Sequence, residues 1–214
     1  MIYITSDFHF AHNKSFLWEP RGFTSAEEHA ATLIENYNSI ISDKDEVYIL
    51  GDLMLSDDVF GIECLRQLKG HKFVAIGNHD TDSRISKYLN SNLFEAIEYG
   101  YRFKFDSFTF WAQHYPSMMG NYKMERPAIC LSGHTHSPNK YENMAVGCYN
   151  VSVDAHHNFP VNIEQIVKDI REYRKTNPII EYPNKSPYCN FCNKAEICEA
   201  KLNHDLKCLG YTSK

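Results

Sequence analysis

The stretch KFVAIGNHD, residues 72–80, decides the fold. A short apolar run ends at a glycine, and an amide, an imidazole and a carboxylate follow at Asn78, His79 and Asp80. A continuous apolar run that is too short for a helix is typical of a strand buried on both faces. Three polar groups of different chemistry, placed where the backbone must turn, indicate a functional site at the end of that strand.

Two similar runs lie upstream, MIYIT at 1–5 and VYIL at 47–50. Apolar residues at helical spacing fill the segments between the strands, at 24–41 and 57–70, and a third helical pattern follows at 82–92. Strands that alternate with helices in this way predict an α/β fold with a largely parallel sheet.

The later part of the chain predicts a second sheet. Apolar runs that read as strands, with few long helices between them, occupy 94–105, 108–114, 128–134 and 149–155. Asp106 and Ser107 are expected to form a hairpin turn, so we expect this sheet to be more antiparallel. An amphipathic helix over 162–175 closes the domain.

Polar side chains follow strand after strand. In open α/β sheets the ligand site lies beyond the carboxyl ends of the strands, so these side chains should share one rim. A glycine precedes three of them and allows a tight turn there. The set comprises Asp7, His9, Asp52, Asn78, His114, His134 and His136.

The chemistry of this set predicts a metal centre. Carboxylate, amide and imidazole ligands suit Mn²⁺, Fe²⁺ or Zn²⁺, and the set contains no cysteine. Seven ligands are too many for one ion. Two ions about 3.5–4 Å apart would use them all and would stabilise both the attacking and the leaving oxygen of an in-line displacement.

These motifs resemble the calcineurin-like metallophosphoesterase superfamily. Its blocks Asp-x-His, Gly-Asp, Gly-Asn-His-Asp, a lone His and Gly-His-x-His all occur in order across residues 7–136. The resemblance extends over residues 1–175 or so. The opening SDFHFAHNKSFLWEPRGF is similar to the small bacterial and phage branch.

The resemblance implies a fold and a ligand assignment. The fold is a four-layer α/β/β/α sandwich, with a phosphoesterase domain over residues 1–176. One ion would be held by Asp7, His9, Asp52 and His136. The other would be held by Asp52, Asn78, His114 and His134, so that Asp52 bridges the two.

His79 is not a ligand in the family. The resemblance makes it the general acid that protonates the leaving oxygen, with Asp80 orienting it. Arg21 is a candidate phosphate clamp, because a guanidinium matches phosphoryl oxygens. His12 lies close enough to His9 in sequence to line the pocket.

The expected activity is hydrolysis of a phosphodiester, nucleotide-type or otherwise small, by attack of a metal-bridging hydroxide. A dedicated general acid matters most for a poor alkoxide leaving group, which favours a diester. The alternatives are a phosphomonoesterase or protein phosphatase, a nuclease acting on nucleic acid ends, and a non-catalytic scaffold. A scaffold should have lost a ligand, and all seven are present.

The C-terminal segment predicts a separate metal centre. A proline-containing linker at 177–187 leads into a tail at 188–214 that carries Cys189, Cys192, Cys198 and Cys208. Four thiolates around one structural Zn²⁺ is the simplest interpretation. A [4Fe–4S] cluster is the alternative.

Composition limits the binding partners and the cellular location that we expect. The 214 residues carry a formal charge of −5, which argues against a broad basic surface for nucleic acid, although a local patch stays open. Neither a signal peptide nor an apolar stretch long enough to span a bilayer is evident, so a cytoplasmic protein without membrane contacts is expected. The sequence leaves the oligomeric state open.

Overall fold

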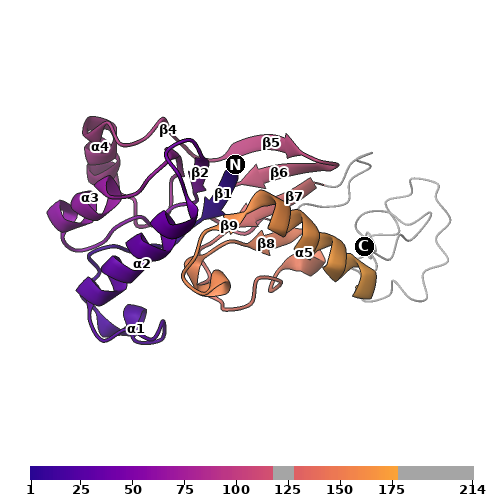
Figure 1. Cartoon of the computed structure of the whole chain (residues 1–214), viewed down its shortest axis with the longest axis horizontal. Coiled ribbons are helices and arrows are strands. Elements are labelled where there is room, and N and C mark those ends of the chain that lie inside the picture. The colour runs from indigo at the N-terminus through magenta and orange to yellow at the C-terminus, as the bar shows by residue number, and fades with distance from the viewer. Residues whose placement is uncertain (118–127, 178–214) are drawn as a thin grey trace, which may run out of the picture.

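The computed structural model of the chain describes residues 1–117 and 128–177. Two β-sheets face each other and helices flank them (Figure 1). The first sheet has the order β4-β3-β2-β1-β9; β1 to β4 run parallel and β9 pairs antiparallel with β1. This confirms the predicted largely parallel sheet. Its strands are β1 (Ile2–Thr5), β2 (Glu46–Ile49), β3 (His71–Ala75), β4 (Ala96–Glu98) and β9 (Val161–Asn162).

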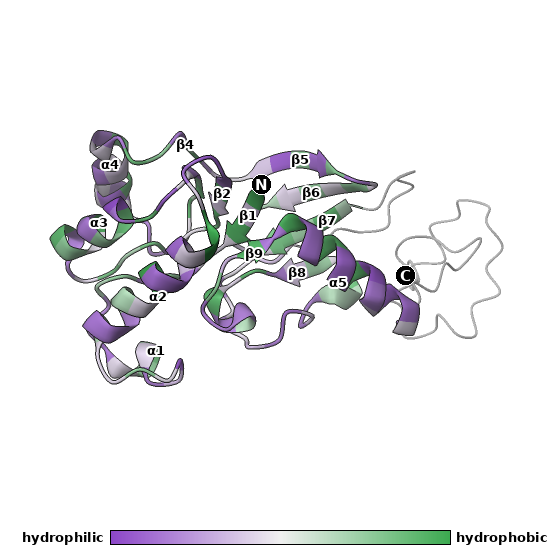
Figure 2. Ribbon diagram, viewed as in Figure 1, coloured by the Kyte–Doolittle hydropathy of each residue, from purple (hydrophilic) through white to green (hydrophobic). Residues whose placement is uncertain are grey.

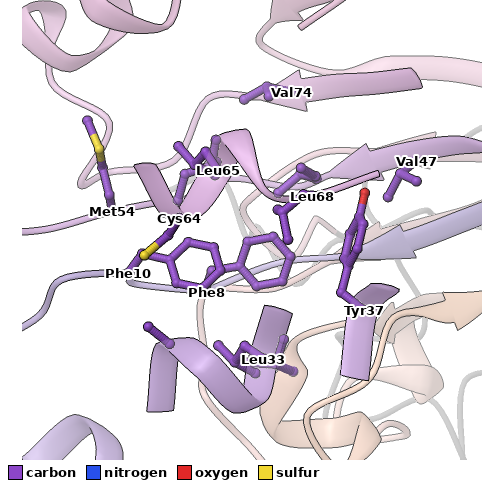
Figure 3. Packing of buried hydrophobic residues seen from close by; sticks show 14 of the residues in the cluster. Phe8, Phe10, Leu33, Tyr37, Val47, Met54, Cys64, Leu65, Leu68 and Val74 are labelled. Carbon is purple, nitrogen blue, oxygen red and sulfur yellow. The ribbon is translucent and has the colours of Figure 1, made fainter. Parts of the chain in front are cut away.

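Three helices cover the outer face of the first sheet, namely α2 (Ala26–Ile40), α3 (Asp58–Arg66) and α4 (Asp82–Ser91). A short helix, α1 (Ser15–Trp18), precedes them. The helices bury one continuous apolar cluster against the sheet (Figure 3), to which α2 contributes Leu33 and Tyr37 and β2 contributes Val47. Burial of a side chain of this size contributes about 1.5–3 kcal/mol. The cluster fixes the strand ends from which the polar segments emerge.

The second sheet has the order β5-β6-β7-β8. The expectation of a more antiparallel sheet was wrong. Only the β5–β6 hairpin is antiparallel, and both other pairings are parallel, because long connections return the chain to the same end of the sheet. The carboxyl ends of β6, β7 and β8 therefore lie at one edge. The strands are β5 (Tyr101–Phe105), β6 (Phe108–Ala112), β7 (Ala128–Ser132) and β8 (Cys148–Asn150).

Two expected strands differ from the structure. The run at 94–105 divides into β4 and β5, and the chain crosses from one sheet to the other at Tyr99 and Gly100. In the run at 149–155 the strand β8 ends at Asn150, and Ser152, still extended, forms an isolated parallel bridge with Ser6. The chain then turns into a short 3-10 helix, Val153–His156, after another at Met144–Val146. Residue type did not mark these breaks: the first falls at Tyr99, an apolar residue that is exposed, and at the second the buried residues continue from Asn150 to Val153.

The space between the sheets holds the second apolar cluster, where Ile4 and Leu50 meet Phe110 and Leu131. Figure 2 shows β1 in the green of hydrophobic residues, as expected for a central strand. The last helix, α5 (Ile163–Thr176), packs against β9 and β1 and adds its apolar face to this cluster. The predicted sandwich is thereby confirmed.

Among the described residues, no helix is both long enough and apolar enough to cross a membrane. The predicted linker lies outside the described residues from position 178 onward, as does the whole tail with its four cysteines. The Zn²⁺ or iron–sulfur centre of the tail stays a prediction.

Candidate metal centre and active site

The polar segments that follow five strands meet at one edge of the two sheets. Backbone hydrogen bonds join the segment after β1 to the one after β2, with Asp7 N donating to Gly51 O at 3.1 Å and His9 N to Asp52 O at 2.9 Å. The amide of His134, which follows β7, donates to the Asp7 carboxylate at 3.0 Å. The sequence prediction of a shared rim agrees with this placement.

One group of side chains gathers around His9. Its Nε2 atom lies 3.1 Å from Nε2 of His136 and 3.5 Å from Oδ2 of Asp52. The Nε2 atom of His136 lies 3.8 Å from Oδ1 of Asp7. The ligand atoms of Asp7, His9 and His136 are close enough to one another to hold one metal ion.

A second group gathers around His114. Its Nε2 atom lies 2.8 Å from Oδ1 of Asn78, 3.2 Å from Nδ1 of His134 and 3.6 Å from Oδ2 of Asp52. Asp7, Asp52 and His114 also satisfy the spacing for one ion. One oxygen of Asp52 thus faces both groups, which is the placement that a bridging carboxylate needs. All seven predicted ligands lie in these two groups.

Five of the seven adopt positive φ angles, which the sequence did not reveal. The values are 62° at Asp7, 49° at His9, 56° at Asp52, 73° at His134 and 52° at His136. Residues other than glycine rarely adopt this conformation, which costs of order 1–3 kcal/mol when the surroundings impose it. Such strain clusters at functional sites, and here it turns each side chain toward the centre as the strand ends.

The glycines next to the ligands act mostly through close approach. Gly51 has the positive φ of +86° that a tight turn needs. At Gly77 and Gly133 the reason differs from the expected turn. A Cβ at Gly77 would lie 2.3 Å from Oδ1 of Asp52, and one at Gly133 would lie 2.0 Å from Oδ2 of Asp7. A side chain at either position would collide with a predicted ligand.

The electrostatics of the site suit divalent cations. Burial lowers the pKa of His9, and the positive charges of its neighbours add to the effect, so its imidazole is neutral and has a free lone pair. Burial also lowers the pKa of His134. Burial raises the pKa of Asp52, although His114 opposes the shift. Two carboxylates, Asp7 and Asp52, are almost fully buried, and buried charges need a partner of opposite sign. Neutral imidazoles beside buried carboxylates therefore fit the metal ions.

The structure corrects the expected relationship between Asp80 and His79. Both Asp80 oxygens are occupied: they accept from the amides of Asp52, Leu53 and Gly77 at 2.8, 3.2 and 2.9 Å and from the Tyr88 hydroxyl at 2.9 Å. Asp80 therefore joins the turns after β2 and β3 and does not orient the His79 ring. The His79 amide donates to Oδ1 of Asp52 at 2.8 Å, and its ring centroid lies 5.3 Å from that of His9.

The structure also corrects the expectation for Arg21. Its side chain is only 2% exposed and forms a two-pronged ion pair with Asp154, so it is not placed to clamp a phosphate from solvent. His12 lies where expected, with its ring centroid 6.0 Å from that of His9 and 5.3 Å from that of the exposed Phe16. Its Nδ1 atom accepts from the amide of Lys14 at 3.1 Å.

Sequence reasoning missed Asp154. Its carboxylate accepts from Nδ1 of His136 at 3.0 Å, and it lies just beyond β8 at the same edge as the other polar segments. Burial opposes the charged form, but the His136 hydrogen bond and the Arg21 charge outweigh it, so the pKa of Asp154 is lowered. Its position after a strand is the signal that could have identified it.

Comparison with known proteins agrees with the fold. The model of the family described as Calcineurin-like phosphoesterase matches residues 1–181. The chain belongs to this family. Membership implies a hydrolase that acts on phosphate esters and uses divalent metal ions.

Two proteins of similar sequence and one of similar structure are compared with the chain by identity and coverage. An uncharacterized protein of Methanocaldococcus jannaschii is 34% identical over 177 residues, which are 80% of this chain and 92% of that protein. The gene 66 protein of Mycobacterium phage L5 is 35% identical over 82 residues, or 36% of this chain and 39% of the phage protein. A protein of unknown function from Aquifex aeolicus has the same fold, with a TM-score of 0.60, 21% identity and coverage of 79% of this chain and 99% of its own.

Proposed function

We propose that the chain is a phosphodiesterase that uses two divalent metal ions and hydrolyses nucleotide-type or other small phosphodiesters. The observation that carries the proposal is the position of one Asp52 oxygen, 3.5 Å from Nε2 of His9 and 3.6 Å from Nε2 of His114. A carboxylate oxygen placed between two imidazole groups can be shared by two ions. A single-ion site would have no use for both groups.

The seven predicted ligands divide as the two groups suggest. Bound Mn²⁺, Fe²⁺ or Zn²⁺ would neutralise charge on the phosphoryl oxygens and lower the pKa of water, which supplies the nucleophile. The first site comprises Asp7, His9, Asp52 and His136. The second comprises Asp52, Asn78, His114 and His134. Asn78 offers a neutral oxygen, so it adds no negative charge beside an anionic substrate.

His79 is the proposed general acid. Its ring lies beside that of His9, and its backbone amide donates to Asp52, which holds the backbone at His79 next to the candidate ligands. The side chain is half-buried, which leaves it accessible to a substrate. A proton from this imidazole to the departing alkoxide would complete cleavage of the ester bond.

A substrate panel tests the proposal. The metal-loaded protein is assayed with an aryl phosphodiester, an aryl phosphomonoester, a cyclic nucleotide, a dinucleotide, a phosphopeptide and a DNA duplex with recessed ends. We expect the value of kcat/KM to be highest for one of the small diesters. Preference for a monoester or a phosphopeptide would contradict the diester assignment, preference for the DNA would indicate a nuclease, and inactivity on all would indicate a scaffold.

A further inference from the structure

The guanidinium of Arg21 is fully engaged inside the protein. A guanidinium has five N–H donors. Nε and one Nη donate to the two oxygens of Asp154, each at 2.8 Å. The same Nη donates to the carbonyl of Asp7 at 2.9 Å. The other Nη faces the carbonyl of Phe8 at 3.4 Å and Nε2 of His29 at 2.9 Å. All five donors therefore have partners among the described residues.

Asp154 connects this arginine to a predicted ligand. The oxygen that Arg21 holds also lies 3.0 Å from Nδ1 of His136. Nδ1 of His136 also lies 3.1 Å from an Nη atom of Arg21, but both hydrogens of that Nη are donated to the Asp7 carbonyl and to Asp154. The Asp154 oxygen is therefore the partner of Nδ1, and a carboxylate can only accept, so the proton of a neutral His136 is on Nδ1 and the lone pair on Nε2. That lone pair points into the group that contains His9 Nε2, 3.1 Å away. Carboxylates that fix the tautomer of a ligating histidine in this way raise its affinity for a metal.

Arg21 also acts on the ligand segment after β1. Asp7 and His9 both have positive φ angles, and the carbonyls of Asp7 and Phe8, which lie between these strained positions, accept from the two Nη atoms. A strained backbone persists only when its surroundings hold it. The guanidinium supplies that constraint from a loop 14 positions further along the chain.

We propose that Arg21 and Asp154 form a buried positioning pair that preassembles the first metal site: Asp154 fixes the tautomer of His136, and Arg21 fixes both Asp154 and the backbone that carries Asp7 and His9. This inference rests on the proposed metal site. Lysine could not replace Arg21, because an ammonium has three donors and lacks the planar fork that meets both Asp154 oxygens.

The test compares two pairs of variants in the full-length chain. Arg21→Lys and Asp154→Asn each disturb the buried pair while keeping side-chain size. Arg171→Lys and Asp106→Asn make the same changes in an exposed pair, whose side chains are 51% and 41% exposed and whose atoms lie 2.7 Å apart. Binding of Mn²⁺ to the metal-free proteins is measured by calorimetry, and circular dichroism reports folding.

We expect Arg21→Lys and Asp154→Asn to weaken binding at one Mn²⁺ site about 10–100-fold, as loss of such partners does in other metal sites. The two control variants should bind like the wild type. Folded buried-pair variants with wild-type affinity would overturn the inference. If the wild type itself bound no Mn²⁺, the proposed metal site would fail first, so the two failures are distinguishable.

A second measurement needs no variant. Nitrogen NMR of metal-free wild-type protein, with histidine labelled in the ring and the pH raised until His136 is neutral, reports which nitrogen of His136 carries the proton. We expect the proton on Nδ1. A proton on Nε2 would overturn the inference even if Arg21→Lys and Asp154→Asn failed to fold, and a purely structural ion pair would not impose this tautomer.

Discussion

The Nε2 atoms of His9 and His136 lie 3.1 Å apart, although 127 positions separate the two residues in the chain. Burial lowers the pKa of His9, so its imidazole is neutral. Burial opposes the charged form of His136 too, but the hydrogen bond to Asp154 and the charge of Asp7 outweigh it, so the pKa of His136 is raised. Neutral His136 keeps a lone pair on Nε2 if Nδ1 donates to Asp154. Two imidazole Nε2 atoms that converge beside the buried carboxylates of Asp7 and Asp52 are the arrangement expected of a cation site.

Replacement of His79 by alanine tests the general acid. We expect normal metal content and a rate lower by about 10²–10⁴-fold, because the alkoxide must then leave unprotonated. The loss should shrink for a p-nitrophenyl ester, whose leaving group needs no proton. Substitution of His71, an exposed histidine at the start of β3, is the control and should change neither quantity. An equal loss for every leaving group, or a fall in metal content, would exclude the role.

Replacement of Asp80 by alanine tests its position between the two turns. Three buried amides and the Tyr88 hydroxyl would lose their acceptor. We expect the free energy of unfolding to fall by about 3–5 kcal/mol, since unpaired buried groups are costly. Tyr88→Phe removes only one of these bonds and should cost about 1 kcal/mol. Urea denaturation measures both, and wild-type stability in the alanine variant would contradict this account.

The sequence predicted the site better than the layout of the second sheet. That the seven candidate ligands lie together could be predicted, because they follow apolar strands and the carboxyl ends of parallel strands meet at one edge. The parallel pairing of β6, β7 and β8 was missed, because strand order depends on long connections that carry no local signal.

The contacts of Asp80 and Arg21 also could not be predicted from the sequence. Asp80 is adjacent to His79, which suggested a contact, but its oxygens point to the amides of a different turn. Arg21 has the chemistry of a phosphate clamp, but it forms an ion pair with Asp154, which is 133 positions away in the chain. Adjacency in the chain and residue type fix neither the direction of a side chain nor its distant partner.

A methyl group at Gly133 should disturb the metal centre. The added Cβ would lie 2.0 Å from an Asp7 oxygen and 2.1 Å from the Ser6 hydroxyl, so both must move. We expect Gly133→Ala to lose about 1–3 kcal/mol of stability and to bind Mn²⁺ more weakly.

Gly70→Ala is the matched control for that substitution. Gly70 precedes β3, at the strand ends opposite the site; its φ is +83° and an added Cβ would lie 2.9 Å from the Asp45 carbonyl, so alanine there introduces strain and a collision without touching a candidate ligand. It should cost about 1–3 kcal/mol and leave Mn²⁺ affinity unchanged. Thermal denaturation and calorimetry measure the two effects, and equal Mn²⁺ affinity in both variants would contradict the prediction.

The stability of the folded protein should decrease as the pH is lowered, partly because of His156. Burial lowers the pKa of His156 to about 4 from the ordinary 6.5, and the charges of Lys140 and His157 lower it further. The hydrogen bond from Nε2 to Asn150 O at 2.9 Å and the charge of Asp169 oppose the shift. Between these values the unfolded chain takes up a proton that the folded protein does not. The contribution is therefore present above pH 6.5 and is lost as the pH falls toward 4, by about 1.4 kcal/mol per pH unit.

The variant His156→Gln keeps a donor for the Asn150 carbonyl but does not titrate. Urea denaturation of the metal-free proteins at pH 7 and pH 5 should show the wild type losing about 2 kcal/mol more than the variant. Equal losses would show that His156 is protonated in the folded protein at pH 5.

The most direct test of the two-metal phosphoesterase measures metal content and activity on the same sample. Wild-type protein is stripped with a chelator, Mn²⁺ is returned in steps, and hydrolysis of an activated phosphodiester is followed, with Asp52→Asn as the comparison because Asp52 faces both groups of ligands. We expect activity to vanish on stripping, to return as Mn²⁺ is bound, and to stay absent in Asp52→Asn, which should retain fewer ions. Full hydrolysis by protein that elemental analysis shows to be free of metal would contradict the account.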